Sequence, residues 1–384
     1  MTSPRIFFYV QHLLGIGHLR RAATIARALV EAGGEVDFVL GGAPVSGIAP
    51  KGARVVQLPP AVASDAQFTD LLDQHGDKVD EAWKARRQQA LLAAFDETRP
   101  DIVLLEMYPF GRRQFRFELL PLLKRVAESR PKPLVAVSVR DILVDKGRMD
   151  RAREAADIVK NHVDKVLVHG DPRLTRFELT FPLAGEIADR LVYTGFVVEQ
   201  QVTAGPAADR DEGEVLVSAG GGAVGFPLLS AAIRAKRLTR HRQRRWRIVT
   251  GANLPAAERR ELDKLAGGDP GIAIEGFRPD FGALLATCQL SVSQGGYNTI
   301  MELIAARCPS VVVPFAEGGE SEQTLRARML VEREVLSMVD PDFLTAGTLA
   351  AAIDAARPPA ALDLNLDGAR QSAAGLIAAW NEGK

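Results

Sequence analysis

The stretch Ser291-Val-Ser-Gln-Gly-Gly-Tyr-Asn-Thr-Ile-Met-Glu302 joins a short apolar segment to a helical pattern through two glycines. Glycines at a strand-to-helix turn let the backbone approach a ligand closely, and the following helix offers N–H groups and the positive end of its dipole. Glu302 lies one to two turns inside that helix, where a carboxylate can accept two hydrogen bonds from a ribose diol. The stretch therefore predicts a nucleotide or nucleotide-sugar site in the C-terminal half.

The alternation of short apolar segments with amphipathic ones extends along almost the whole chain. In the first half we expect strands at 5–10, 35–40, 53–58, 101–106, 134–139, 165–169 and 191–195, and helices at 18–32, 112–129 and 148–162. The pattern restarts near residue 214, with strands expected at 214–218, 246–250, 272–276, 290–293, 309–313 and 335–339. Such alternation indicates an α/β fold with parallel, doubly wound sheets covered on both faces.

A length of 384 residues suits two domains better than one core. We expect an N-terminal domain over 1–199, a polar linker over 200–213, a C-terminal domain over 214–365, and a final helix within 366–384 that packs back on the first domain. Residues 59–98 are expected to form a long helix-rich excursion. Two doubly wound domains facing across a cleft would place their strand-to-helix loops at that cleft, so these loops are where function is sought.

Composition narrows the class of protein. The chain is 47% hydrophobic and 25% charged with zero formal net charge, so nothing global favours nucleic acid as a partner. Cys288 and Cys308 lack metal-ligand spacing and are expected to be buried thiols in a reducing compartment. The first residues lack a signal-peptide layout, and no apolar run reaches the roughly 18 residues of a membrane span. We therefore expect a cytoplasmic protein, soluble or peripheral at a membrane.

The loop after the first strand, Gln11-His-Leu-Leu-Gly-Ile-Gly-His-Leu-Arg20, carries the candidate catalytic residue. Gly15 and Gly17 permit a tight turn, and His18 then begins a helix. There the helix dipole disfavours imidazolium and keeps the ring neutral, as a general base requires. The alternative is a helix cap or a packing role for His18.

The remaining loops supply candidate binding residues. Ser218-Ala-Gly-Gly-Gly-Ala-Val-Gly225 can wrap backbone N–H groups around a pyrophosphate, although it matches neither a Walker A loop nor the dinucleotide spacing, and a plain tight turn is the alternative. The candidates for donor binding are Ser218, Gly220, Gly221, Gly222, Phe277, Gln294, Gly295, Gly296, Asn298, Thr299, Glu302, Glu322 and Gln323. The alternatives are a capping role for Glu302 and, for the loop before Gln323, an ordinary helix start capped by Ser321.

Two strand ends in the first domain provide candidates on the acceptor side, Glu106 and Arg140, together with Gly15 and Gly17. The basic segments 112–117 and 234–247 have the charge to meet an anionic surface, but solvated helix faces are the simpler interpretation.

With these loops in place, the chain resembles the GT-B glycosyltransferases, and most of all the family 28 group that includes the N-acetylglucosaminyltransferase of peptidoglycan synthesis. The resemblance rests on Gly15-Ile-Gly-His18, Ser218-Ala-Gly-Gly-Gly222, and Gln294-Gly-Gly-Tyr-Asn-Thr-Ile-Met-Glu302 with the later Glu322-Gln323. It departs from the family where Ile16 splits the usual glycine pair before His18, and where Glu322 replaces the usual Asp or His.

The resemblance implies two Rossmann-like domains and an inverting, metal-independent transfer from a nucleoside-diphosphate sugar, by default a UDP-sugar. Glu302 would bind the ribose, the glycine loops the diphosphate, and Glu322 with Gln323 the sugar, with His18 as base. No cofactor or metal is implied beyond the nucleotide-sugar co-substrate. The acceptor would be a hydroxyl of a small molecule, a glycan or a lipid-linked sugar, with at most peripheral contact at the inner membrane face.

Three other functions remain open from the sequence. The Gly-Ile-Gly-His-Leu-Arg-Arg stretch also resembles a nucleotide-sugar hydrolase, in which His18 would activate water. A nucleotide-sugar 2-epimerase shares the fold but demands several acids at the site. A non-catalytic nucleotide-sugar binding protein would keep the donor site without using His18.

Overall fold

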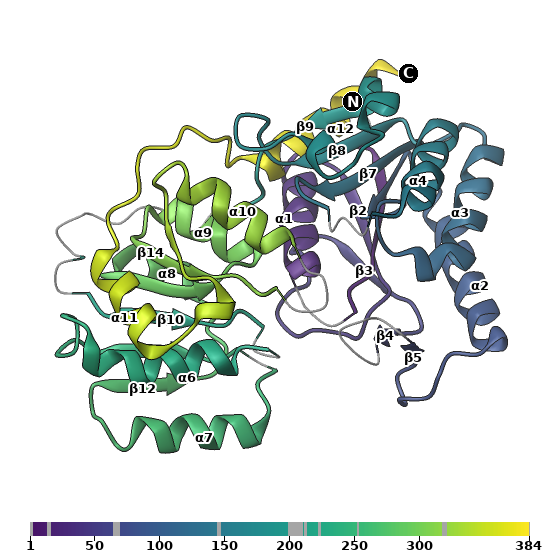
Figure 1. Cartoon of the computed structure of the whole chain (residues 1–384). Coiled ribbons are helices and arrows are strands. Elements are labelled where there is room, and N and C mark those ends of the chain that lie inside the picture. Colours follow the sequence, from purple (N-terminus) through teal and green to yellow (C-terminus); the bar gives the residue numbers. More distant parts are fainter. Residues whose placement is uncertain are drawn as a thin grey trace. The chain divides into compact units, whose positions relative to one another are not determined.

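The computed structural model describes residues 3–13, 17–63, 70–143, 147–198, 210, 213–221, 224–251, 253–316 and 321–383. The chain divides into two compact units, Met1–Val197 with Leu364–Lys384, and Val198–Asp363 (Figure 1). The expected linker, 200–213, lies outside the described residues except for positions 210 and 213.

The first unit is built on a seven-stranded parallel sheet in the order β3-β2-β1-β6-β7-β8-β9. Its strands are β1 (Arg5–Val10), β2 (Glu35–Leu40), β3 (Arg54–Gln57), β6 (Ile102–Glu106), β7 (Leu134–Arg140), β8 (Lys165–His169) and β9 (Leu191–Tyr193). The helices are α1 (Gly17–Glu31), α2 (Glu81–Thr98), α3 (Arg116–Glu128), α4 (Met149–His162) and α12 (Gly368–Glu382), with 3-10 turns η1 (Arg113–Phe115), η2 (Phe177–Leu179) and η3 (Ala184–Arg190).

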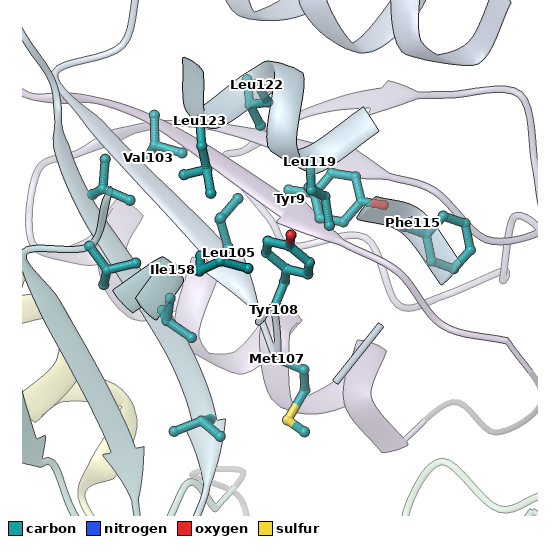
Figure 2. Close-up of a cluster of buried hydrophobic side chains, with 14 of the residues drawn as sticks. Tyr9, Val103, Leu105, Met107, Tyr108, Phe115, Leu119, Leu122, Leu123 and Ile158 are labelled. Carbon is teal, nitrogen blue, oxygen red and sulfur yellow. The ribbon is translucent and has the colours of Figure 1, made fainter. Parts of the chain in front are cut away.

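Alternating side chains of the central strands pack into two separate hydrophobic cores, one on each face of the sheet. Phe7 and Tyr9 of β1 point into one core, whereas Ile6 and Phe8 point into the other, because successive strand residues face opposite sides of a sheet. The first core also contains Val103, Leu105, Phe115, Leu119, Leu122 and Leu123 (Figure 2). Both faces of the sheet are therefore covered at its centre, which explains why the central strands β1, β6 and β7 are largely apolar.

Two segments of this unit bear on the expected domain plan. Helix α12, yellow in Figure 1, packs on α1 and adds Ala369, Ala373 and Leu376 to the second core. The expected helix-rich excursion over 59–98 is only partly helical. Its described part begins with the short antiparallel pair β4 (Val62–Ala63) and β5 (Leu71–Leu72), and only its second half, α2, is a helix.

The second unit contains a six-stranded parallel sheet in the order β12-β11-β10-β13-β14-β15. Its strands are β10 (Val215–Ser218), β11 (Trp246–Val249), β12 (Ile272–Glu275), β13 (Leu290–Gln294), β14 (Ser310–Val313) and β15 (Ser337–Met338). Its helices are α6 (Phe226–Ala235), α7 (Ala256–Ala266), α8 (Phe281–Thr287), α9 (Tyr297–Ala306), α10 (Glu322–Val331) and α11 (Ala346–Ala355), with turns η4 (Lys236–Leu238) and η6 (Pro341–Phe343).

Each sheet has one position where the chain reverses its direction of winding. In the first unit this position lies between β1 and β6, and in the second it lies between β10 and β13. The loops that leave two such strands run to opposite sides of the sheet and open a crevice at the carboxyl ends, which is where open α/β sheets bind their ligands.

Candidate functional site

In the first unit, the winding reversal brings His18 and Glu106 together. His18 is the second residue of α1, which follows β1, and Glu106 is the last residue of β6, the neighbour of β1. The two side chains meet with 2.8 Å between His18 Nδ1 and Glu106 Oε1. The Glu106 side chain is fully buried, whereas 18% of the His18 side chain is exposed. Nδ1 of the imidazole is thus held by a buried carboxylate, while part of the ring remains exposed to solvent.

The contacts of His18 assign its tautomer. Glu106 as a carboxylate can only accept, so Nδ1 must carry the proton that it donates. On the other side of the ring, Arg140 Nη2 lies 3.2 Å from Nε2, and since a guanidinium only donates, Nε2 presents a lone pair. Arg21 Nη2 also lies 3.2 Å from Nδ1, but it donates to Glu106 Oε1 over the shorter distance of 2.6 Å and leaves Nδ1 to donate to the same oxygen. Together the contacts indicate the Nδ1–H tautomer, with Nε2 able to take a proton.

Charge and burial keep His18 neutral and Glu106 ionised, and a general base must be neutral. Burial, together with the positive charges of Arg112 and Arg140, lowers the pKa of His18 to about 3 despite the opposing effect of Glu106. Burial alone would raise the pKa of Glu106, but His18, Arg21 and Arg112 outweigh burial and hold that pKa at about 2. At neutral pH the imidazole is neutral and the carboxylate ionised. Burial and the nearby arginines account for the lowered pKa of His18.

Two buried residues, Glu106 and Arg21, contact His18. Glu106, which the sequence predicts on the acceptor side, is completely buried and contacts both His18 and Arg21. Arg21 is 4% exposed and donates to Glu106 over 2.6 Å. Gly17 begins α1 and is exposed, and Gly15 lies outside the described residues.

Three strand-to-helix loops of the second unit touch one another beside its winding reversal. Ser218 of β10 pairs in register with Ser293 of β13, which places the two following loops side by side. Gln294 Nε2 donates to Val224 O over 3.3 Å, joining the loops after β13 and β10. Gln323 Oε1 accepts from the Phe315 N–H over 3.0 Å, within the segment that follows β14.

Glycine is required at specific positions in this cluster. A Cβ on Gly295 would lie 3.2 Å from Val312 Cγ1 and 3.4 Å from Gln323 Oε1, so the loop after β13 packs closely on the segment after β14. Gly220 has φ +60°, and its N–H donates to Ser218 Oγ over 3.2 Å, which leaves the Ser218 hydroxyl proton for another acceptor. Gly220 and Gly221 are exposed, and Gly222 lies outside the described residues.

Helix α9 starts at this cluster without a capping side chain. Its N-cap is Gly296, so no side-chain oxygen of that residue can accept from the first-turn N–H groups. Asn298 and Thr299 lie half-buried in the first turn. Glu302 is 5% exposed in the second turn, which argues against the alternative of an N-terminal cap because capping acts within the first turn.

The remaining donor candidates, Glu322, Gln323 and Phe277, differ in their exposure and in their contacts. Glu322 is 1% exposed and pairs with Arg326 over 2.9 Å, so its carboxylate is engaged within α10 and faces no solvent here. Gln323 is half-buried and lies against Gly295. Phe277 is 50% exposed after β12, two strands away from β10. Ser321 occupies the N-cap position of α10, but its side chain makes no capping hydrogen bond.

Sequence reasoning missed a buried network that supports the first strand. Arg87 of α2 is fully buried and binds Glu118 of α3 through Nε over 2.8 Å. Its Nη2 donates to Gln11 Oε1 over 2.6 Å, and Arg112 Nε donates to Gln11 O over 2.7 Å. Gln11 directly follows β1 and leads towards His18. In sequence Arg87 stands among the polar residues Lys84, Arg86, Gln88 and Gln89 and resembles a solvated arginine, so only its charge partner could have revealed this role.

The two basic segments also have internal partners. Arg112 is tied to Gln11, Lys236 pairs with Asp269 over 3.0 Å, and Arg247 pairs with Glu214 over 2.5 Å. Among the residues that the structure describes, no three His, Cys, Asp or Glu side chains gather as a metal site would require. None of the described helices is long and apolar enough to cross a membrane.

Comparison with known proteins matches the region that holds the second cluster. Residues 216–374 match the glycosyltransferase family 28 C-terminal domain. The chain carries a family 28 C-terminal domain. The N-terminal loop with His18 lies outside the matched residues, so the family match concerns the proposed donor side.

Relatives and solved structures agree with this match. Over 135 residues the chain is 33% identical to the UDP-N-acetylglucosamine–N-acetylmuramyl-(pentapeptide) pyrophosphoryl-undecaprenol N-acetylglucosamine transferase of Chromohalobacter salexigens, covering 32% of this chain and 37% of the relative. The enzyme of the same name from Thiobacillus denitrificans is 29% identical over 196 residues, covering 48% of this chain and 52% of the relative. The chain therefore spans about half, or less, of the curated relatives that it matches.

A solved structure extends the similarity to the complete fold. The MurG of Acinetobacter baumannii superposes with a TM-score of 0.57 at 12% identity, covering 99% of each chain. At this identity the similarity shows the fold alone. The fold is that of the GT-B glycosyltransferases, as the sequence resemblance predicts.

Proposed function

We propose that this protein is a glycosyltransferase that moves a sugar from a nucleoside-diphosphate sugar to a hydroxyl acceptor with inversion at the sugar. The observation that carries the proposal is the convergence of the loops after β10, β13 and β14 beside the winding reversal of a family 28 domain. A UDP-sugar is the proposed donor, because the two curated relatives described above are named for a UDP-sugar.

The donor is assigned to the second unit. The glycine loops and the uncapped start of α9 would bind the diphosphate, since backbone N–H groups and a helix N-terminus favour anions. The Ser218 hydroxyl would donate to a phosphate oxygen, and Glu302 would accept from the ribose hydroxyls. Gln323, held against Gly295, would contact the sugar. These same N–H donors would stabilise the departing diphosphate, so the proposal invokes no metal ion.

The base is assigned to His18. Its Nε2 would take the proton of the acceptor hydroxyl as the oxygen attacks the anomeric carbon and the bond to the diphosphate breaks. The Glu106 carboxylate, 2.8 Å from Nδ1, would then stabilise the imidazolium that forms. Arg140 donates to Nε2 in this structure, so the acceptor hydroxyl would take the place of that contact.

The acceptor is proposed as a hydroxyl of a small molecule, a glycan or a lipid-linked sugar. The curated relatives are named for a lipid-linked acceptor, which supports the last of these and peripheral placement at the inner membrane face.

A hydrolase is the second candidate, because the same His18–Glu106 pair could activate water. Turnover of the donor without any acceptor, at the full rate, would favour the hydrolase. Donor binding that is retained in His18→Ala while turnover is lost would argue against a non-catalytic binding protein.

The first experiment is a thermal-shift panel of nucleoside diphosphates and nucleotide sugars. A ligand at about 100 times its Kd stabilises the native state by about 2.7 kcal/mol, which raises the melting temperature by several degrees. We expect one nucleoside diphosphate to be selected and its shift to be lost in Glu302→Ala. Glu261→Ala, an exposed carboxylate on α7, is the matched control and should retain the shift. No shift from any compound would contradict the donor assignment.

A further inference from the structure

Arg21 contacts the His18–Glu106 pair but has no role in the reaction proposed above. It lies one turn after His18 on α1, and its side chain is only 2% exposed. Its Nη2 donates to Glu106 Oε1 over 2.6 Å and lies 3.2 Å from His18 Nδ1. One oxygen of Glu106 therefore serves both the guanidinium and the imidazole.

A fully buried carboxylate requires a charge partner to remain ionised, because burial favours the neutral acid. His18 is neutral, so it supplies a hydrogen bond but no full charge. Arg21 donates directly to the carboxylate, and Arg112, whose Nε is bonded to Gln11 O, adds a more distant positive charge. Arg21 is thus the cation in hydrogen-bond contact with Glu106.

We propose that Arg21 is a positioning residue that keeps Glu106 as a carboxylate and thereby keeps His18 in the Nδ1–H tautomer. The catalytic consequence rests on the proposed function, whereas the tautomer itself does not. A carboxylate accepts the Nδ1 proton and leaves the lone pair on Nε2. A protonated Glu106 would instead donate to Nδ1, and the imidazole proton would move to Nε2, where the ring could no longer take a proton.

Other charged and titratable groups lie near the His18–Glu106 pair. Arg112 precedes η1, Arg140 ends β7, and His169 ends β8, with its buried ring bonded to Ser138 Oγ over 2.7 Å. His169 stays neutral because burial and Arg21 lower its pKa to about 3. Without Arg21, Arg112 would hold Glu106 ionised less strongly, and the pKa of Glu106 would rise.

The test compares Arg21→Met, which removes the charge, with Arg21→Lys, which retains it. Arg27→Met is the matched control, being a half-buried arginine on the same helix whose Nη2 donates to Thr24 Oγ1. Nitrogen-15 NMR of the imidazoles reports which ring nitrogen carries the proton, and the signals of His18 are assigned by their loss in His18→Gln. Transfer activity is followed against pH for each variant.

We expect His18 to be Nδ1–H in the wild type, in Arg21→Lys and in Arg27→Met, and to shift towards Nε2–H in Arg21→Met. We expect kcat to fall by about 10-fold to 100-fold in Arg21→Met, with KM for the donor unchanged, because the loss lies in proton transfer.

A folded Arg21→Met protein that keeps the Nδ1–H signals would overturn the inference, and so would Nε2–H signals in the wild type, which requires no variant to fold. If the tautomer shifts as expected but the wild type transfers no sugar, the positioning role stands and the proposed function fails. The two failures are therefore distinguishable.

Discussion

Arg87→Met should destabilise the first unit more than any surface charge substitution. Arg87 and Glu118 both have fully buried side chains, joined through Nε–Oε2 at 2.8 Å and Nη2–Oε1 at 3.0 Å. Arg87 Nη1 also donates to the carbonyls of Gly41 and Pro59 over 2.7 and 2.6 Å. Methionine fills a similar volume but leaves the Glu118 carboxylate buried without its cation. Removing one member of a buried pair costs about 3–5 kcal/mol.

The matched control is Arg125→Met on α3. Arg125 pairs with Asp96 over 2.8 Å, but their side chains are 51% and 45% exposed, so water screens the charges. An exposed pair of this kind contributes about 0.2–1 kcal/mol. The predicted difference between the two variants is therefore about 2–4 kcal/mol.

Hydrogen exchange of the β1 and β6 backbone amides is the appropriate assay, because it reports the opening of the first unit separately from that of the second. The double variant Arg87→Met with Glu118→Leu should recover part of the loss, since it removes the unpaired charge as well. If Arg87→Met lowers the opening free energy by no more than Arg125→Met, the reasoning from burial is refuted.

Three further outcomes are expected. Gly251→Ala should lower the unfolding free energy of the second unit by about 2 kcal/mol more than Gly268→Ala, measured by urea denaturation. Both glycines have positive φ, +78° and +75°, but only at Gly251 would an added Cβ meet backbone atoms, at 2.4 Å. Equal losses in the two variants would contradict this reasoning. The pKa values of His18 and His169 are lowered to about 3, so between pH 6.5 and 3 only the unfolded chain binds these protons. The unfolding free energy of the first unit should therefore fall by about 1.4 kcal/mol per pH unit for each histidine as pH drops from 6.5 towards 3. A flat profile in urea titrations would show that these rings do protonate in the folded state. Arg140→Met should raise the pKa of His18 by removing a nearby positive charge, measured by NMR titration, and an unchanged pKa would contradict the contact with Nε2.

Much of the architecture follows from local pattern. The strand expected at 5–10 is Arg5–Val10, and the helix expected at 148–162 is Met149–His162, because apolar period and polar turns are local properties. The glycine pair before α9 also marks a strand-to-helix turn from sequence alone. The segment 59–98 misled because the short pair β4–β5 depends on contacts rather than on local periodicity.

The donor candidates show which properties of the site could be predicted from sequence and which could not. The residues at the carboxyl ends of β10 and β13 could be named from sequence, since parallel strands place their following loops at one edge. Glu322 could not be judged, because its pairing with Arg326 and its burial depend on how α10 packs.

By itself the sequence determined the alternation of strands and helices and the glycine turns, since these depend on period and backbone freedom. Only the tertiary structure decided that Glu106 and Arg21 support His18. These residues are 85 positions apart in sequence, and they meet because β1 and β6 are neighbours in the sheet. The charge state of a buried side chain depends on which other charges the fold brings within a few ångströms, and that information is not local.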